Sequence, residues 1–294
     1  MLNTRVSFTQ LIAIEQRKLF GRALLWAELG ILALLVTLAH VALVITLQKG
    51  NPGQLPPEAV AEFRRMLQWP QALDNALSFA NGGELGGMLV AILVGAFVAQ
   101  EYTWHTVHSW LSRGISRSHY LLAKFVVISM ALLLIVLTTL VAGGAVTAVF
   151  TYVDTGTLPL SAVNGPRLLL NVLRVTFTLL PYAALTLLLA VVSRSTMVAI
   201  GVALGYSLLV ENLLVEMLVL LSPTAARVAR FFPTMLAKSI VRLVSRAGEV
   251  NVGLNMPTET LLLSPNTAAF ILAGYTLLFL TAAIWWFRQQ DVTV

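Results

Sequence analysis

Four ionisable side chains stand inside long apolar segments, where a charge is costly and therefore indicates a functional role or a structural ion pair. They are Glu28, Arg174, Glu211 and Glu216. Arg174 and Glu211 lie deepest, and we expect them either to meet as an ion pair or to line a transport pathway. Glu28 and Glu216 either line that pathway too or place their charges at the level of the lipid headgroups.

The sequence lacks the motifs that would make this chain an enzyme. It has no Gly-x-x-x-x-Gly-Lys-[Ser/Thr], and so no loop that could hold the phosphates of ATP. His-Glu-x-x-His, Gly-x-Ser-x-Gly and cysteine are also missing, which excludes zincin-type, serine-hydrolase and thiol chemistry. His105 and His108 are three residues apart, but no carboxylate or thiolate nearby completes a metal site. We expect no catalytic residue, cofactor or metal in this chain.

Composition places these residues in a membrane protein. Of 294 residues, 58% are hydrophobic and only 11% are charged, and the mean hydropathy is +0.85. Soluble domains carry about 25% charged residues, so a soluble protein is excluded. The net charge of +6 is typical of basic loops beside a membrane and does not indicate nucleic acid binding.

Helices that cross a bilayer need about 20 apolar residues, because lipid offers no partner for backbone polar groups. Six segments meet this requirement, so the predicted fold is an all-α integral membrane protein. They are Leu24 to Leu47, Leu85 to Gln100, Phe125 to Phe150, Leu168 to Val192, Thr196 to Leu221 and Thr267 to Phe287. Only Ser193, Arg194 and Ser195 separate the fourth segment from the fifth, which predicts a tight helical hairpin.

The total count of basic residues does not decide the orientation, because the Lys and Arg residues other than Arg174 divide equally between the two predicted sides of the membrane. The orientation follows instead from where the basic residues gather. Arg17, Lys18 and Arg22 crowd the start of the first span, whereas only Lys49 lies close to its other end. Basic residues favour the cytoplasmic side. We therefore expect both termini in the cytoplasm, with 48–84 and the basic loop 222–264 outside.

Short amphipathic helices are predicted beside the spans. Residues Val6 to Phe20, within 1–23, alternate apolar and polar side chains, which indicates either an interfacial helix or a solvated start to the first span. In the outer loops, Glu58 to Trp69 has helical periodicity after two prolines. Before the sixth span, a helical stripe indicates a short outer-face helix and consists of Leu236, Ile240, Leu243 and Val244.

The polar segment Gln100 to Lys124, between the second and third spans, carries a recognisable pattern. It resembles the Glu-Tyr-x-x-Gly-Thr, Leu-x-x-Gly-x-Ser-Arg and Leu-x-x-Lys pattern of ABC-2 type permeases, the membrane subunits of type V ABC exporters. One departure is His105, which stands where that family has glycine. Ser193 to Thr196, followed by Ala199 to Gly201 and Glu211, also resembles the entry to the fifth span of that family. The matching residues of the first pattern are Glu101, Tyr102, Thr106, Leu111, Gly114, Ser116, Arg117, Leu121 and Lys124.

The resemblance implies a single transmembrane domain over 1–294 that dimerises and binds two copies of a separate ATPase, which would hold ATP and Mg²⁺. It also implies a bacterial cell membrane, a gate formed by the outer helices, and a cytoplasmic coupling helix within 101–124. The residues expected to couple the chain to the ATPase are Glu101, Tyr102, Thr106, Arg113, Arg117 and Lys124.

The sequence is also compatible with two other functions. One is a transporter or channel without ATP, driven by ions through Glu211 and Arg174. The other is a membrane anchor or sensor subunit that transports nothing. A merely basic loop with an aromatic belt would account for 101–124 in either case.

Overall fold

The structure is a computed structural model that describes residues 7–49, 57–83, 85–103, 115–244 and 262–290. Within those ranges it contains helices and no strands. Six helical segments are long and apolar enough to cross a membrane, which confirms the six predicted spans and a multi-pass membrane protein. The spans are α2 Ala23–Lys49, α5 Leu85–Thr103, α7 Arg117–Thr155, α8 Gly165–Ser193, the run of α9 Thr196–Gly205, η2 Tyr206–Leu214 and α10 Val215–Leu221, and α13 Pro265–Gln289.

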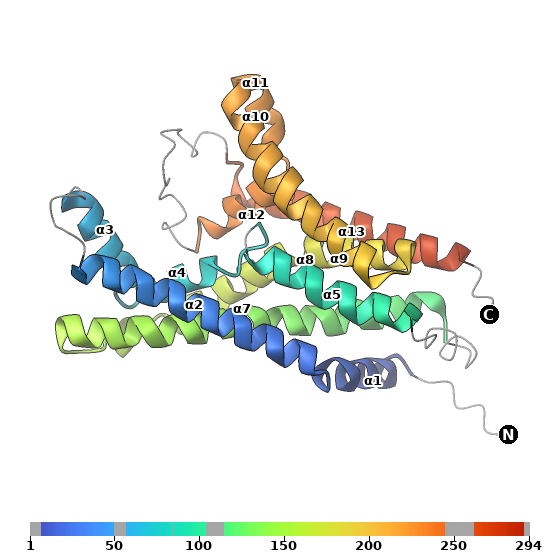
Figure 1. The fold of residues 1–294 in the computed structure, drawn as a ribbon, viewed down its shortest axis with the longest axis horizontal. Coiled ribbons are helices and arrows are strands. Elements are labelled where there is room, and N and C mark those ends of the chain that lie inside the picture. The colour runs from blue at the N-terminus through green and yellow to red at the C-terminus, as the bar shows by residue number, and fades with distance from the viewer. Residues whose placement is uncertain (1–6, 50–56, 84, 104–114, 245–261, 291–294) are drawn as a thin grey trace.

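The spans α2, α5, α7 and α8 form the body of the bundle (Figure 1). Helix α7 contacts α2 and α8, while α8 also contacts α5 and α13, so α7 and α8 occupy the centre. One apolar core joins them through side chains from several helices, including Val36, Phe97, Ile128, Leu132 and Leu187. Burial of these side chains fixes the rotation of each helix about its own axis, and thereby decides which polar residues face inward.

Helix ends follow the local sequence. Ser7 begins α1 (Phe8–Phe20) with a reciprocal capping box, in which Ser7 Oγ accepts from the Gln10 backbone and Gln10 Oε1 accepts from the Ser7 backbone. Helix α7 ends at Gly156, whose φ of 74° lies in the left-handed region that glycine adopts readily. The predicted hairpin between the fourth and fifth spans is present: Arg194 ends α8 and Ser195 caps α9.

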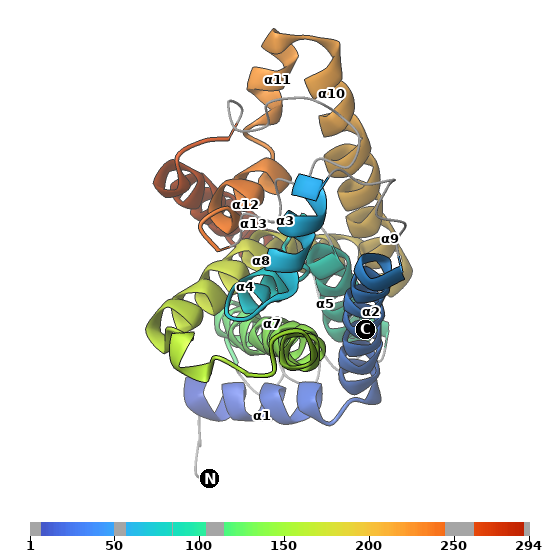
Figure 2. The same cartoon turned by 90° about the vertical axis from the view of Figure 1, so that its left-hand side faces the viewer.

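The fifth span is not a regular α-helix. Its middle third, Tyr206–Leu214, is a π-helix, in which the backbone bonds five residues apart. The segment then continues through α10 and turns back at α11 (Pro223–Ala229), so α10 and α11 lie together at one edge of the structure (Figure 2). This departure from α geometry changes which side chains share a face, and no local pattern in the sequence indicates it.

Short helices occupy both predicted outer loops. Helix α3 (Pro57–Leu67) corresponds to the predicted helix after the two prolines, and α4 (Gln71–Ser78) is an additional helix that periodicity did not indicate. Before the sixth span lie α11 and α12 (Pro233–Val241). In the predicted stripe, Leu236, Ile240 and Val244 are buried, whereas Leu243 is 41% exposed.

The predicted linker 101–124 is not one separate element. Helix α5 continues to Thr103, and α7 begins at Arg117, so the two ends of this segment are extensions of spans two and three. Residues 104–114 lie outside the described residues. Glu101 and Lys124 are therefore set in the spanning helices themselves.

Candidate coupling site

A ring of four charges joins three helices at one end of the bundle. It consists of Glu15 on α1, Glu101 on α5, Lys124 on α7 and Lys18 on α1, and we call it the four-charge ring. Lys18 Nζ lies 2.6 Å from Glu15 Oε1 and 3.2 Å from Glu101 Oε1. Lys124 Nζ lies 2.7 Å from Glu15 Oε2 and 2.9 Å from Glu101 Oε2. Each lysine thus bridges both carboxylates, and the formal charges cancel.

The ring is nearly closed to solvent. Glu15, Glu101 and Lys124 are buried, and only Lys18 reaches the surface, with 26% of its side chain exposed. Such a buried set is stable only when every charge has partners, because removing one leaves an uncompensated charge in a medium of low dielectric constant. The ring therefore holds α1, the end of α5 and the start of α7 in one arrangement.

Aromatic side chains complete the surroundings of the ring. The Tyr120 hydroxyl donates to Glu101 Oε2, and Lys124 Nζ lies 4.2 Å from the centre of the Phe97 ring, within reach of a cation–π interaction. Arg22, at the start of α2, stacks on the same Phe97 at 5.2 Å and donates to Gln100 Oε1 at 2.9 Å. Burial lowers the pKa of the Arg22 guanidinium, and the nearby carboxylates oppose this effect.

Arg117 fastens the end of the last span to this region. Its guanidinium donates to the backbone carbonyls of Phe287 at 2.9 Å and Arg288 at 3.0 Å, and also to that of Gln290. In return, Arg288 donates to Ser118 Oγ at 2.8 Å. Helix α1 and the end of α13 therefore lie at the same end of the bundle (Figure 1).

The structure assigns different surroundings to the residues predicted to couple with an ATPase. Glu101 and Lys124 meet in the ring, while Arg117 contacts α13. The Tyr102 ring packs edge-on against Phe287, with ring centres 6.5 Å apart. Thr106 and Arg113 lie outside the described residues. Because Glu101 and Lys124 are buried, they can act on a partner only by positioning helices, not by touching it.

Sequence analysis missed Glu15, Lys18 and Tyr120 as members of this site. One signal was available: Lys124 begins a long apolar run that carries no acidic residue until Asp154, so its partner had to come from another segment. The spacing of Glu15 and Lys18 on the predicted N-terminal helix placed both on one face. Nothing in the sequence indicated that this face packs against α7.

The ion pair, one of the two roles expected for Arg174 and Glu211, is wrong. Glu211 is buried on η2, and its Oε2 accepts a hydrogen bond of 2.6 Å from the hydroxyl of Tyr182 on α8. Arg174 instead donates to Asn171 Oδ1 at 3.0 Å. The π-helix turns Glu211 toward the Tyr182 face of α8, whereas Arg174 lies two turns away along that helix.

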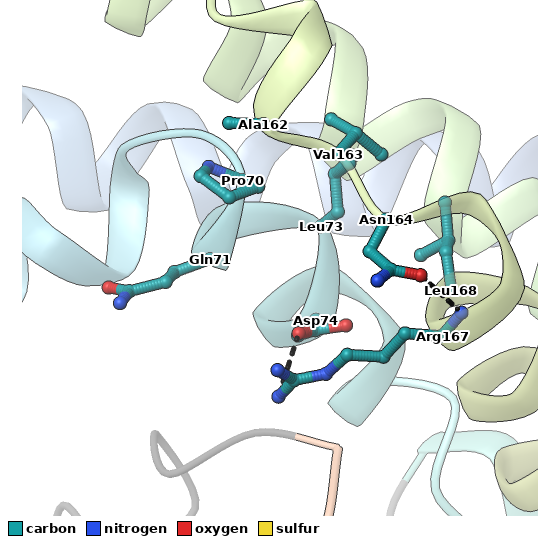
Figure 3. A pocket seen from close by; sticks show the side chains of 9 residues that line it. All are labelled: Pro70, Gln71, Leu73, Asp74, Ala162, Val163, Asn164, Arg167 and Leu168. Carbon is teal, nitrogen blue, oxygen red and sulfur yellow. Dashed lines mark hydrogen bonds and ion pairs between the residues drawn. The ribbon is translucent and has the colours of Figure 1, made fainter.

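Arg174 belongs to a polar network that involves α4. Asn171 links it to Asp74, donating to Asp74 Oδ1 at 2.8 Å. Arg167 approaches the other Asp74 oxygen at 3.9 Å beside a cavity of about 220 Å³ (Figure 3). Burial raises the pKa of the Asp74 carboxyl, while the Asn171 hydrogen bond and the charge of Arg167 oppose the rise.

The two remaining acidic candidates differ in what the structure describes. Glu28 on α2 is only 5% exposed, and neither of its carboxylate oxygens has a hydrogen-bond partner among the described residues. Its side chain is therefore packed among the helices of the bundle. Glu216 belongs to α10, but its side chain lies outside the described part of the structure.

Within the described ranges, no group of three or more His, Cys, Asp or Glu side chains could hold a metal.

Comparison with known families places most of the chain in one of them. The profile of a family described as "Protein of unknown function (DUF2705)" matches residues 83–293, from the start of α5 to the end of α13 and beyond. That range contains Glu101, Lys124, Tyr182 and Glu211 but not α1, which supplies the other half of the four-charge ring. No curated protein matches the chain.

Proposed function

The chain belongs to the DUF2705 family, and we propose that it is the membrane-spanning permease subunit of an ATP-driven exporter of the ABC-2 type. In this proposal a separate ATPase binds the cytoplasmic end of the bundle and a second copy of the chain completes the transport pathway. The chain itself would not hydrolyse ATP in this proposal, because the sequence contains no phosphate-binding loop of the Gly-x-x-x-x-Gly-Lys-[Ser/Thr] type.

The observation that carries the proposal is the four-charge ring. It lies where the spans on either side of 104–114 meet the N-terminal helix, which is the position that the sequence pattern marks for coupling. A force applied to 104–114 by a partner would reach α5 through Thr103 and α7 through Arg117. Because the ring ties both helices to α1, the three would move as one body.

The Arg117 contacts extend this body to the last span. Arg117 holds the end of α13 against the start of α7, and Gln290, which follows α13, donates from its Nε2 to the Val191 carbonyl of α8 at 2.7 Å. Motion at 104–114 would therefore also reach α8. An ATPase that pushed on one short segment would in this way displace four spans. A rigid, water-excluded junction is suited to this task because it transmits displacement without rearranging its own bonds.

The test begins with the tagged full-length chain, purified from its own cells in mild detergent after chemical crosslinking. We expect an ATPase polypeptide in the purified complex, identified by mass spectrometry, and ATP hydrolysis that disappears when this polypeptide is removed. Glu101→Gln combined with Lys124→Met removes one charge of each sign and leaves Glu15 paired with Lys18, so it should leave the complex assembled but abolish the effect of the permease on hydrolysis.

The matched control is Asp154→Asn. Asp154 forms a single ion pair of 3.5 Å with Arg64, and it lies near the opposite end of α7. This variant should behave as the wild type does. A chain that crosslinks to no ATPase, or a doubly substituted chain with unchanged transport and unchanged hydrolysis, would contradict the proposal.

A further inference from the structure

A second polar cluster, separate from the four-charge ring, contains buried oxygen atoms that have no partner. Glu211 Oε1, Ser207 Oγ and Thr234 Oγ1 have no hydrogen bond within the described residues, and each of these residues is only 1% exposed. A buried polar atom without a partner is unfavourable, and several of them at one place need an explanation. A ligand bound by these atoms together would provide that explanation.

Three helical segments bring these oxygens to one place. In the π-helix η2, residues four and five apart lie on the same face, so Ser207 and Tyr206 stand beside Glu211. The Tyr206 hydroxyl faces the carboxylate, as does the backbone of Thr234 at the start of α12. From α8, Tyr182 donates to Glu211 at 2.6 Å, and its hydroxyl also faces the Thr234 side chain.

Two glycines close the cluster on the side of α5. A Cβ atom on Gly83 would lie 2.0 Å from Thr234 Oγ1, and one on Gly82 would lie 2.5 Å from Tyr182 Cε2. Only residues without a side chain allow the backbone before α5 to approach so closely. On this side the polar atoms are thus enclosed by tight packing, which favours a ligand the size of a single ion.

The chemistry of the cluster selects the kind of ion. Every candidate ligand atom is oxygen, from one carboxylate and the hydroxyls of serine, threonine and tyrosine, and such hard ligands bind alkali and alkaline-earth cations. One carboxylate balances a single positive charge. Lys238 lies one turn further along α12 and makes the electrostatic potential at the carboxylate more positive, without a hydrogen bond to it. This positive charge disfavours a divalent ion.

We propose that Glu211, Ser207, Thr234 and Tyr182 form a binding site for one monovalent alkali cation of the size of Na⁺, between α8, η2 and α12. Bound there, the cation would satisfy the three unpartnered oxygens and join the fifth span to the helix that precedes the sixth. The site goes beyond the proposed exporter function and requires no ATPase.

The test measures thermal unfolding of the purified full-length protein in choline chloride and in sodium chloride, at constant pH and ionic strength. Because a ligand of the folded state stabilises it by mass action, Na⁺ should raise the Tm by about 2 °C or more. Glu211→Gln should abolish the rise. Ser207→Ala should weaken the apparent Na⁺ affinity several-fold, and Lys238→Met, which removes a repelling charge, should strengthen it.

The matched control is Glu28→Gln, since Glu28 is also a buried carboxylate with no hydrogen-bond partner in the described part of the chain but belongs to another helix. It should keep the full response to Na⁺. Binding of radioactive sodium to the same variants provides a second measurement if Glu211→Gln folds poorly. An equal Tm in choline and sodium, a Tm that responds to pH but not to Na⁺, or a Na⁺ response that survives Glu211→Gln would each overturn the proposal.

Discussion

Lys124 Nζ lies 2.7 Å from Glu15 Oε2, although the two residues are 109 positions apart in the chain. Lys124 is two turns inside the third span, and Glu15 is on the helix that precedes the first. Both side chains are excluded from solvent, so this contact fixes the N-terminal helix against the bundle. The face of the N-terminal helix that carries Leu11, Glu15 and Leu19 is thus buried against the bundle.

The first prediction concerns the charge balance of the four-charge ring. Lys124→Met leaves two carboxylates with one lysine, and an uncompensated buried charge commonly costs about 3 to 5 kcal/mol. The Tm of the variant should fall sharply. Adding Glu15→Gln removes one negative charge and should restore most of the lost stability.

The control for this prediction is Arg64→Gln, which breaks an ion pair whose arginine is 57% exposed. Exposed pairs contribute about 0 to 1 kcal/mol, so its Tm should barely change. Equal losses in Lys124→Met and Arg64→Gln would show that the ring is not a buried unit.

A second prediction tests the orientation through the two ends of α7. At 39 residues, α7 is about 58 Å long and exceeds the hydrocarbon core of about 30 Å, so both ends should reach water. The chain has no native cysteine. In intact cells, Thr157→Cys should react with an impermeant thiol reagent, and His119→Cys should react only after the cells are opened. The reverse pattern would mean that the termini are outside.

A third prediction tests whether Glu211 interacts with Tyr182 or with Arg174. Because Tyr182 donates to Glu211 at 2.6 Å, the stability losses of Tyr182→Phe and Glu211→Gln should not add in the double variant. The losses of Arg174→Gln and Glu211→Gln should add, since these residues do not meet. Tm values for both cycles give the two coupling energies. A large coupling between Arg174 and Glu211 would be incompatible with the structure.

A fourth prediction follows from the raised pKa of Asp74. The folded state holds the Asp74 proton more tightly than the unfolded chain, so this group stabilises the fold most at acidic pH, below its usual value of 3.8. That contribution is lost as pH rises through the folded-state pKa. Asp74→Asn keeps an oxygen for the Asn171 hydrogen bond but does not titrate. Its Tm minus that of the wild type should therefore increase between about pH 4 and pH 7. A decrease would mean that the carboxylate is favoured in the folded state.

The sequence alone determined the elements of this protein. The six apolar runs of membrane-spanning length, and the tight turn around Arg194 between the fourth and the fifth of them, appear in the structure where local pattern placed them. These features depend on interactions within a few residues, or on the match between the length of a segment and the thickness of a bilayer. The same is true of the missing phosphate-binding loop, which is a property of local sequence.

Only the tertiary structure decided which polar groups meet. Glu101 and Lys124 were both marked by the sequence, but their partners Glu15 and Lys18 come from a helix whose packing against α7 no local pattern encodes. Glu211 was expected to face Arg174 and instead faces Tyr182, because a π-helix rotates it by a fraction of a turn. Contacts between helices depend on rotation about each axis, which is set by the sum of many apolar contacts across the bundle.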